Sequence, residues 1–134
     1  MNIVVIDKEN LPEGVEFPFL EAPKYGWIER IEVSDEELAE VAWRSHVLVT
    51  TKKAISAAVV EKLPLLKMVV IVGDCADKSC DLVDFEAMAA RQIKISHVPG
   101  GSVNSAAEAE QCVAQVVRNI DAMMRGAAVN LIDS

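Results

Sequence analysis

The residues of this chain that are best suited to chemistry lie between Ile95 and Glu108, in the sequence ISHVPGGSVNSAAE. This pattern predicts a short strand, a glycine turn and a serine-capped helix in direct succession. Backbone N–H groups converge where a helix begins, and the helix dipole adds roughly half a positive charge there, so carboxylates and phosphates are favoured. We therefore expect Gly100, Gly101 and Ser102 to contact an anionic ligand. The alternative is that the turn only reverses the chain, as turns of this composition often do.

A second polar stretch, residues 73–84 with the sequence GDCADKSCDLVD, combines aspartates with two of the three cysteines. The spacing of Cys75 and Cys80 is not the C-x2-C of structural zinc, and no histidine is near in sequence. We expect a solvated acidic loop and no metal site. Because the number of cysteines is odd and the N-terminus has no export signal, we also expect Cys75, Cys80 and Cys112 to be reduced thiols.

Composition limits the classes to which the protein can belong. A chain of 134 residues, 51% of them hydrophobic, predicts one globular domain with its own core. The net charge of −8 argues against a nucleic-acid partner, which would need clustered Lys and Arg. No apolar run approaches the ~20 residues of a membrane-spanning helix, and the N-terminal residues lack the basic start of a signal peptide. We expect a cytoplasmic protein that binds no membrane.

Apolar runs typical of strands alternate with helical patterns along the chain. The irregular stretch that contains Pro12, Pro18 and Pro23 interrupts this alternation, and Ser34 with Glu37 forms a capping box that opens the first helix. The expected strands are residues 3–6, 28–33, 47–50, 68–72 and 93–96. One helix is expected to begin at residue 34, and three more are expected over residues 56–63, 83–91 and 105–124.

Strands separated by helices at this spacing imply a parallel sheet, because parallel neighbours need crossover connections. We therefore predict an α/β fold, a flavodoxin-like doubly wound sheet of about five parallel strands with a long C-terminal helix. Ligands of such sheets bind beyond the carboxyl ends of the strands. In this chain that edge holds Asp7, residues 50–53, residues 73–84 and residues 97–102, and Lys52 is its best placed cation.

Apolar residues recur at steps of three and four along the last helix. An apolar helix face left exposed marks an interface, so we expect a homodimer built on this helix. The residues expected at the interface are Ala106, Ala109, Val113, Val116, Val117 and Ile120.

Four short motifs occur in order: Thr50-Thr51-Lys52, then LPLLK at residues 63–67, then residues 83–90, then residues 97–108. In this order they resemble the amino-terminal substrate domain of the D-isomer-specific 2-hydroxyacid dehydrogenases. The corresponding family motifs are "TNK", "LP-x-LK", "VD-x-x-AA" and "N-V-P-G-x-S-x-x-S-V-A-E". The first of these is typical of the glycerate dehydrogenase and hydroxypyruvate reductase branch. The resemblance covers about residues 1–125.

The resemblance implies a two-domain enzyme that acts on a small 2-keto or 2-hydroxy acid with NAD(H) or NADP(H) held in a Rossmann domain. No G-x-G-x-x-G follows the last helix in this sequence, and neither His46 nor His97 matches the family's catalytic histidine. We therefore expect a flavodoxin-like substrate domain over residues 1–104, a crossover or dimerisation helix and tail over residues 105–134, no cofactor domain and no catalytic residue. By itself such a chain binds no cofactor and transfers no hydride.

The loop after the fourth strand departs from the family. The resemblance places Gly73 and Asp74 where a Gly-x-Gly or Thr-Gly loop holds the substrate carboxylate, and it places Lys52 at the substrate cleft. In this chain the loop is longer and acidic, with only Lys78 to offset three aspartates, so carboxylates should be repelled.

Two function classes follow from these observations. One is a truncated substrate domain of a dehydrogenase, inactive in hydride transfer, and the alternative is a stand-alone homodimeric binding or interaction module. A receiver-like signalling domain fits less well, because no acidic residue follows the third strand.

Overall fold

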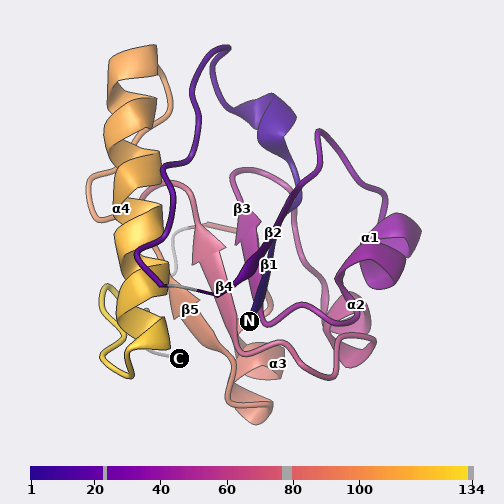
Figure 1. Cartoon of the computed structure of the whole chain (residues 1–134). Helices are drawn as coiled ribbons and strands as arrows, with labels where there is room; N and C mark the ends of the chain where they lie inside the picture. The colour runs from indigo at the N-terminus through magenta and orange to yellow at the C-terminus, as the bar shows by residue number, and fades with distance from the viewer. Residues whose placement is uncertain (23, 77–79, 133–134) are drawn as a thin grey trace.

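The computed structural model of this chain describes residues 1–22, 24–76 and 80–132. Strands and helices alternate along it, except that an irregular stretch joins the first two strands (Figure 1). The elements are β1 (Asn2–Val5), the 3-10 helix η1 (Lys8–Asn10), β2 (Gly26–Glu29), α1 (Asp35–Ala42), β3 (Val47–Thr50), α2 (Ala57–Glu61), β4 (Met68–Ile71), α3 (Phe85–Ala90), β5 (Lys94–Ser96) and α4 (Ala106–Met124).

The strands form one parallel sheet in the order β2-β1-β3-β4-β5, which confirms the predicted doubly wound α/β fold. Strand β2 begins and ends earlier than the predicted 28–33, because its register pairs Gly26 with Asn2 and Glu29 with Val5. An edge strand continues only as far as its single neighbour, so β2 ends with β1.

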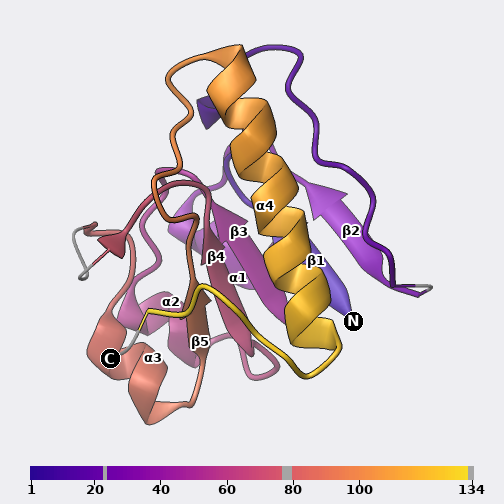
Figure 2. The ribbon, with the colours of Figure 1, turned by 90° about the vertical axis from the view of Figure 1, so that its left-hand side faces the viewer.

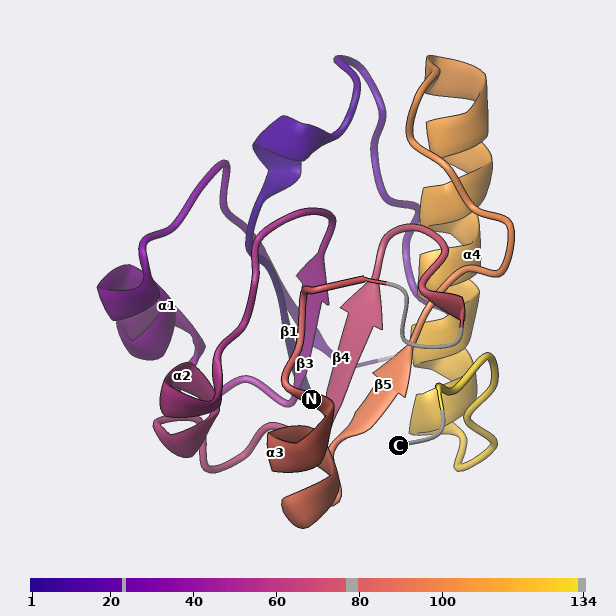
Figure 3. The same ribbon diagram turned by 180° about the vertical axis from the view of Figure 1, so that it is seen from behind.

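Successive side chains of the strands point to opposite faces of the sheet and divide the core into two halves. Val4 and Leu48 pack on the face that α1, α2 and α3 cover, while Ile3 and Val49 pack on the opposite face against α4. Figure 2 shows α4 lying across its face, and Figure 3 shows the three shorter helices on the other side.

Helix α4 also anchors the irregular stretch between β1 and β2. The Asp121 carboxylate is 5% exposed and accepts hydrogen bonds from the backbone N–H groups of Glu21 (3.0 Å) and Ala22 (3.3 Å). Leu11, Val15 and Leu20 of the same stretch join the core beneath the helix. The proline-rich segment is therefore irregular, as predicted, and also fixed to the sheet face.

The chain returns to β5 after α4. Ser96 and Leu131 form an isolated antiparallel bridge, and the Ile132 N–H donates to the Ile95 carbonyl at 2.8 Å. Figure 2 shows this returning segment beside β5. The free edge of β5 is thereby covered by residues of the same chain.

Among the helices described, none is both long and apolar enough to cross a membrane.

Candidate functional site

The loops that follow β1 and β3 are joined at the carboxyl edge of the sheet by one side chain, Asp7. Its carboxylate accepts hydrogen bonds from the N–H groups of Thr51 (2.9 Å), Lys52 (2.6 Å) and Lys53 (2.9 Å), and from the Asn10 side-chain amide (2.8 Å). Asp7 is 2% exposed. The residue thus fixes the backbone that carries Lys52.

Lys52 lies at this edge as the sequence predicts, with an exposed side chain. It lines a small cavity of about 230 Å³ together with Asp7 and Lys53. Lys53 forms an ion pair with Asp35 (2.6 Å), whereas the Lys52 ammonium has no ion pair within the described part of the chain. Glu9 and Glu32 line the same cavity, so Lys52 is an exposed cation among acidic neighbours.

The loop after β4 begins with Gly73, whose φ of +145° favours glycine. Asp74 then folds its carboxylate back onto the backbone: Oδ1 accepts from the Ala76 N–H at 2.9 Å, and Oδ2 accepts from the Gly100 N–H at 3.0 Å. These two backbone hydrogen bonds lower the pKa of Asp74, and the bond from the Ala76 N–H has the larger effect. The Asp74 carboxylate therefore occupies the position in which an anionic ligand was expected.

The Pro-Gly-Gly turn packs tightly against Val98. Gly100 has φ +70°, and a Cβ on Gly101 would lie 2.7 Å from Val98 Cγ1, so neither position accommodates a side chain without strain. The Gly101 N–H donates to the Val98 carbonyl (2.8 Å), and the Ser102 hydroxyl accepts from the Asn104 N–H (3.1 Å). The expectation that these amides are free for a ligand is wrong for Gly100 and Gly101.

The start of α4 is capped by its own residues. Ser105 accepts the Glu108 N–H at 3.2 Å, as predicted, and its hydroxyl also bonds to the Glu108 carboxylate at 3.1 Å.

His97 is buried and serves the loop structurally. Its Nδ1 accepts the Cys75 N–H at 3.0 Å and lies 3.4 Å from Asp74 Oδ1. The imidazole ring therefore contacts both the backbone and the Asp74 side chain of this loop. His97 thus orients the loop after β4.

Cys75 and Cys80 form a disulfide, with a Cα–Cα distance of 5.2 Å. The expectation of three reduced thiols is therefore wrong for this pair. The two cysteines are five residues apart in sequence, and the structure brings them together. The expectation was based on the absence of an export signal, which does not take such proximity into account. Cys112 is a free, buried thiol, and burial raises its pKa to about 11.

The other acidic residues of the loop have separate roles. Asp84 caps α3 by accepting the Ala87 N–H at 3.0 Å, and Asp81 is exposed. Asp77 and Lys78 lie outside the described residues. Within the described ranges, no group of three or more His, Cys, Asp or Glu side chains is placed to hold a metal ion.

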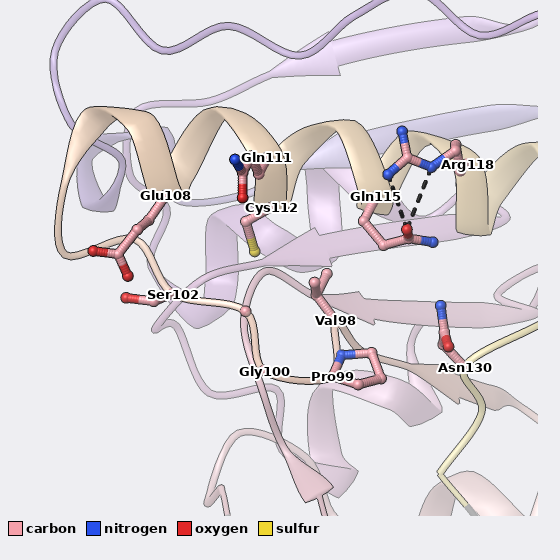
Figure 4. A pocket seen from close by; sticks show the side chains of 11 residues that line it. Val98, Pro99, Gly100, Ser102, Glu108, Gln111, Cys112, Gln115, Arg118 and Asn130 are labelled. Atoms are coloured by element: carbon pink, nitrogen blue, oxygen red, sulfur yellow. Dashed lines mark hydrogen bonds between the residues drawn. The ribbon is translucent and has the colours of Figure 1, made fainter.

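A cavity of about 440 Å³ lies between the Pro-Gly-Gly turn and α4 (Figure 4). Glu108, Gln111, Gln115 and Arg118 line it from the helix, and Arg118 donates to the Gln115 side-chain oxygen at 2.9 Å. Gln111, Gln115 and Arg118 were not predicted to contribute to a site. Their recurrence at steps of three and four was the available signal, because it places them on one side of the helix.

Asn119, also missed from sequence, connects this cavity to β5. Its side-chain amide donates to the Ser96 hydroxyl and to the His97 carbonyl, both at 2.9 Å, while its oxygen accepts from Gln115 and Asn130, both at 2.8 Å. Asn119 is 0% exposed. This network fixes the strand end from which the turn departs.

Most of the apolar face of α4 is covered by the sheet of the same chain, so five of the six expected interface residues are buried within the domain. The packing is decided by the apolar strand residues on that face, such as Val70, which require a cover. Ala106 alone among the six expected interface residues is exposed, and the other five are at most 4% exposed: Ala109, Val113, Val116, Val117 and Ile120.

The predicted ligand residues therefore fall into two groups. Gly73, Asp74, Gly100 and Gly101 belong to one bonded unit that joins the loops after β4 and β5. Asp74 binds the Gly100 N–H, the Gly73 carbonyl accepts from Val98 at 2.9 Å, and the Gly101 N–H donates to the Val98 carbonyl. Ser102 follows this unit and bonds to Asn104. Lys52 lies in the separate cavity beyond β3.

Solved structures share this fold. The chain superposes on a D-3-phosphoglycerate dehydrogenase-type oxidoreductase from Ralstonia solanacearum with a TM-score of 0.62 and 16% identity, covering 95% of this chain and 40% of that one. For an NAD+-bound 3-phosphoglycerate dehydrogenase from Entamoeba histolytica the TM-score is 0.56, with 18% identity and coverages of 74% and 33%. For the D-lactate dehydrogenase from Escherichia coli the TM-score is 0.54 and the identity 16%, and the match covers 76% of this chain and 32% of that one.

The chain thus spans well under half the length of these structures. No match was found among curated proteins. Residues 4–133 match the family described as D-isomer specific 2-hydroxyacid dehydrogenase, catalytic domain. This match covers nearly the whole sequence, and the chain therefore belongs to the catalytic domains of the D-isomer-specific 2-hydroxyacid dehydrogenases.

Proposed function

We propose that this chain is a substrate domain of the 2-hydroxyacid dehydrogenase type whose carboxylate-binding loop is closed by its own side chain, Asp74. The observation that carries the proposal is the pair of hydrogen bonds from the Ala76 and Gly100 N–H groups to the Asp74 carboxylate. A substrate carboxylate would need the same kind of donors. In this conformation the 134-residue polypeptide does not hold a 2-keto acid at the loop.

The substrate class that we propose for this edge is a small 2-keto or 2-hydroxy acid. The exposed Lys52 ammonium, which has no ion pair among the described residues, supports it, since a lysine at the carboxyl edge of a parallel sheet attracts an anion to that edge. Without release of Asp74, Lys52 acts alone, and an exposed ammonium by itself binds weakly.

NAD(H) or NADP(H) is the cofactor that the family implies, and the described residues do not fit it. After α4 the chain returns to β5, where Ile132 bonds to Ile95, instead of entering a glycine turn and a second helix. We therefore derive no hydride transfer from these residues, and we expect the 134-residue polypeptide alone to oxidise no NADH or NADPH with glyoxylate or hydroxypyruvate.

The test is calorimetric titration of the wild type and of Asp74→Ala with glyoxylate, hydroxypyruvate and glycerate. We expect no heat for the wild type and saturable, millimolar binding for Asp74→Ala, because the Ala76 and Gly100 amides become free donors. Asp81→Asn is the matched control, since it removes one charge from the same loop at an exposed position. Equal binding by the wild type and Asp74→Ala would show that Asp74 does not close the loop.

A homodimeric binding or interaction module is the second candidate. The stand-alone part of this candidate is supported by the segment of residues 129–132 that covers β5 and by the self-bonded loop, because both satisfy backbone groups of this edge within the chain. Since the apolar face of α4 packs inside the domain, a homodimer would use other exposed surface. Sedimentation at micromolar concentration tests it, and a monomer would exclude this candidate.

A further inference from the structure

Four of the six aromatic residues of this chain gather around one cavity at the β2 edge of the sheet. The cavity has a volume of about 620 Å³ and lies between residues 16–19 and β2. It is at the opposite edge of the sheet from β5 and the closed loop, since β2 and β5 are the two outer strands (Figure 2). The aromatic residues that line it are Phe17, Phe19, Tyr25 and Trp27.

The rings are arranged so that their faces are not stacked on one another. The centroids of Phe17 and Trp27 are 5.5 Å apart with planes at 58°, and those of Tyr25 and Trp27 are 6.4 Å apart with planes at 83°. Phe19 is 91% exposed, the largest value among the exposed large hydrophobic residues. The Phe19 ring is therefore accessible to a molecule that enters the cavity.

The charges around the rings are negative on the cavity side. Glu16 and Glu29 line the cavity, and no Lys or Arg is among its described lining residues. Lys8 forms ion pairs with both carboxylates, to Glu29 at 3.0 Å, from outside the lining. These ion pairs fix the positions of the two carboxylates. Lys8, Glu16 and Glu29 together carry one net negative charge.

The Trp27 ring is hydrogen-bonded to a carboxylate at the rim of the cavity. Its indole Nε1–H donates to the Glu29 Oε2 at 2.9 Å. A carboxylate that accepts this hydrogen bond pushes electron density into the ring, and the negative face of an aromatic ring attracts cations. An anion at this cavity would meet the Glu16 and Glu29 carboxylates, with no Lys or Arg among the described lining residues.

We propose that this aromatic cavity binds a small organic cation that carries an alkylated ammonium group. Methyl groups on the nitrogen spread the charge over an apolar surface, which suits ring faces better than a strongly hydrated primary ammonium does. A volume of about 620 Å³ lies in the range of small-molecule sites. This site is independent of the proposed function of the loop after β4.

The experiment compares choline with its neutral isostere 3,3-dimethyl-1-butanol, at constant ionic strength, by fluorescence titration. The background variant Trp43→Phe leaves Trp27 as the single tryptophan, and Trp43 is a suitable site because it lies at the end of α1, beneath Arg44. We expect a saturable change of Trp27 emission with choline in the millimolar range and none with the alcohol.

Phe19→Ala in that background should weaken choline binding about fivefold, which is the order of one cation–π contact at an exposed site. Because Phe19 is almost fully exposed, this variant should fold, and circular dichroism checks that it does. Glu16→Gln should weaken binding less, by about threefold, since the carboxylate acts through the charge alone. Equal binding of the alcohol, no saturation with choline, or unchanged affinity in Phe19→Ala would each overturn the proposal.

Discussion

Two aspartates organise loops at the same edge of the sheet in opposite environments. Asp7 follows β1, is 2% exposed and accepts four N–H bonds, three of them from the backbone after β3. The Asp74 side chain follows β4, is 41% exposed and accepts two backbone N–H bonds. Both use a carboxylate to satisfy the amides of a neighbouring loop.

The difference lies in what could replace each carboxylate. Water reaches the amides around Asp7 poorly, so its loss leaves buried donors without partners. The amides that Asp74 holds lie at the surface, where water or the carboxylate of a ligand can take its place. The same bonding pattern is therefore structural at β1 and exchangeable at β4.

Asp7→Ala should give the largest loss of stability. We expect the free energy of unfolding to fall by about 3 kcal/mol, because the Thr51, Lys52 and Lys53 N–H groups lose their acceptor. Urea unfolding followed by circular dichroism measures it. Asp7→Asn, which keeps one oxygen acceptor, should lose about half as much.

The control for this prediction is Asp35→Ala, which removes the exposed carboxylate that pairs with Lys53. It should change the free energy of unfolding by about 0.5 kcal/mol or less, as surface ion pairs do. Similar losses in Asp7→Ala and Asp35→Ala would show that burial does not distinguish the two sites.

Replacing both Cys75 and Cys80 by serine should have an intermediate effect. Opening a crosslink between residues five apart lowers the free energy of unfolding by about 2 kcal/mol in the loop-entropy description. The loop after β3 has no such crosslink and depends on Asp7 instead. Unfolding of the wild type with and without a dithiol reductant is the parallel measurement, and identical midpoints would argue against the bond.

Asp74→Asn should have the smallest effect, and that effect should depend on pH. Because folding lowers the pKa of Asp74 below its ordinary value of 3.8, the charged carboxylate stabilises the fold above that value. This contribution is lost as the pH falls through the lowered pKa. The difference in Tm between the wild type and Asp74→Asn should therefore shrink below pH 3.8, and a constant difference down to about pH 2 would contradict this prediction.

Several local features of the fold were predictable from sequence. Ser34 caps α1 and accepts the Glu37 N–H at 3.2 Å, and Ser105 caps α4, both at the predicted positions. Capping depends on residues three apart, so a single short segment contains the whole interaction. The parallel sheet was predictable for a similar reason, since strand and helix periodicities are local.

The closed loop was only half predictable. Asp74 was identified as an acid in the wrong place for a carboxylate site, but its bond to Gly100 joins residues 26 apart. That bond exists because β4 and β5 are neighbours and their carboxyl ends meet. The Asn119 network and the aromatic cavity at β2 arise in the same way, from segments that only packing brings together.

The sequence by itself determined the order of strands and helices, the helix caps and the family, and it indicated which loops lie at the carboxyl edge of the sheet. The tertiary structure alone decided that α4 covers the sheet instead of an exposed interface, that Cys75 joins Cys80, and that Asp74 occupies the amides of the turn. The physical reason is the range of the interactions. Periodicity and capping act within a few residues, whereas a carboxylate finds its donors only after the sheet has brought distant loops together.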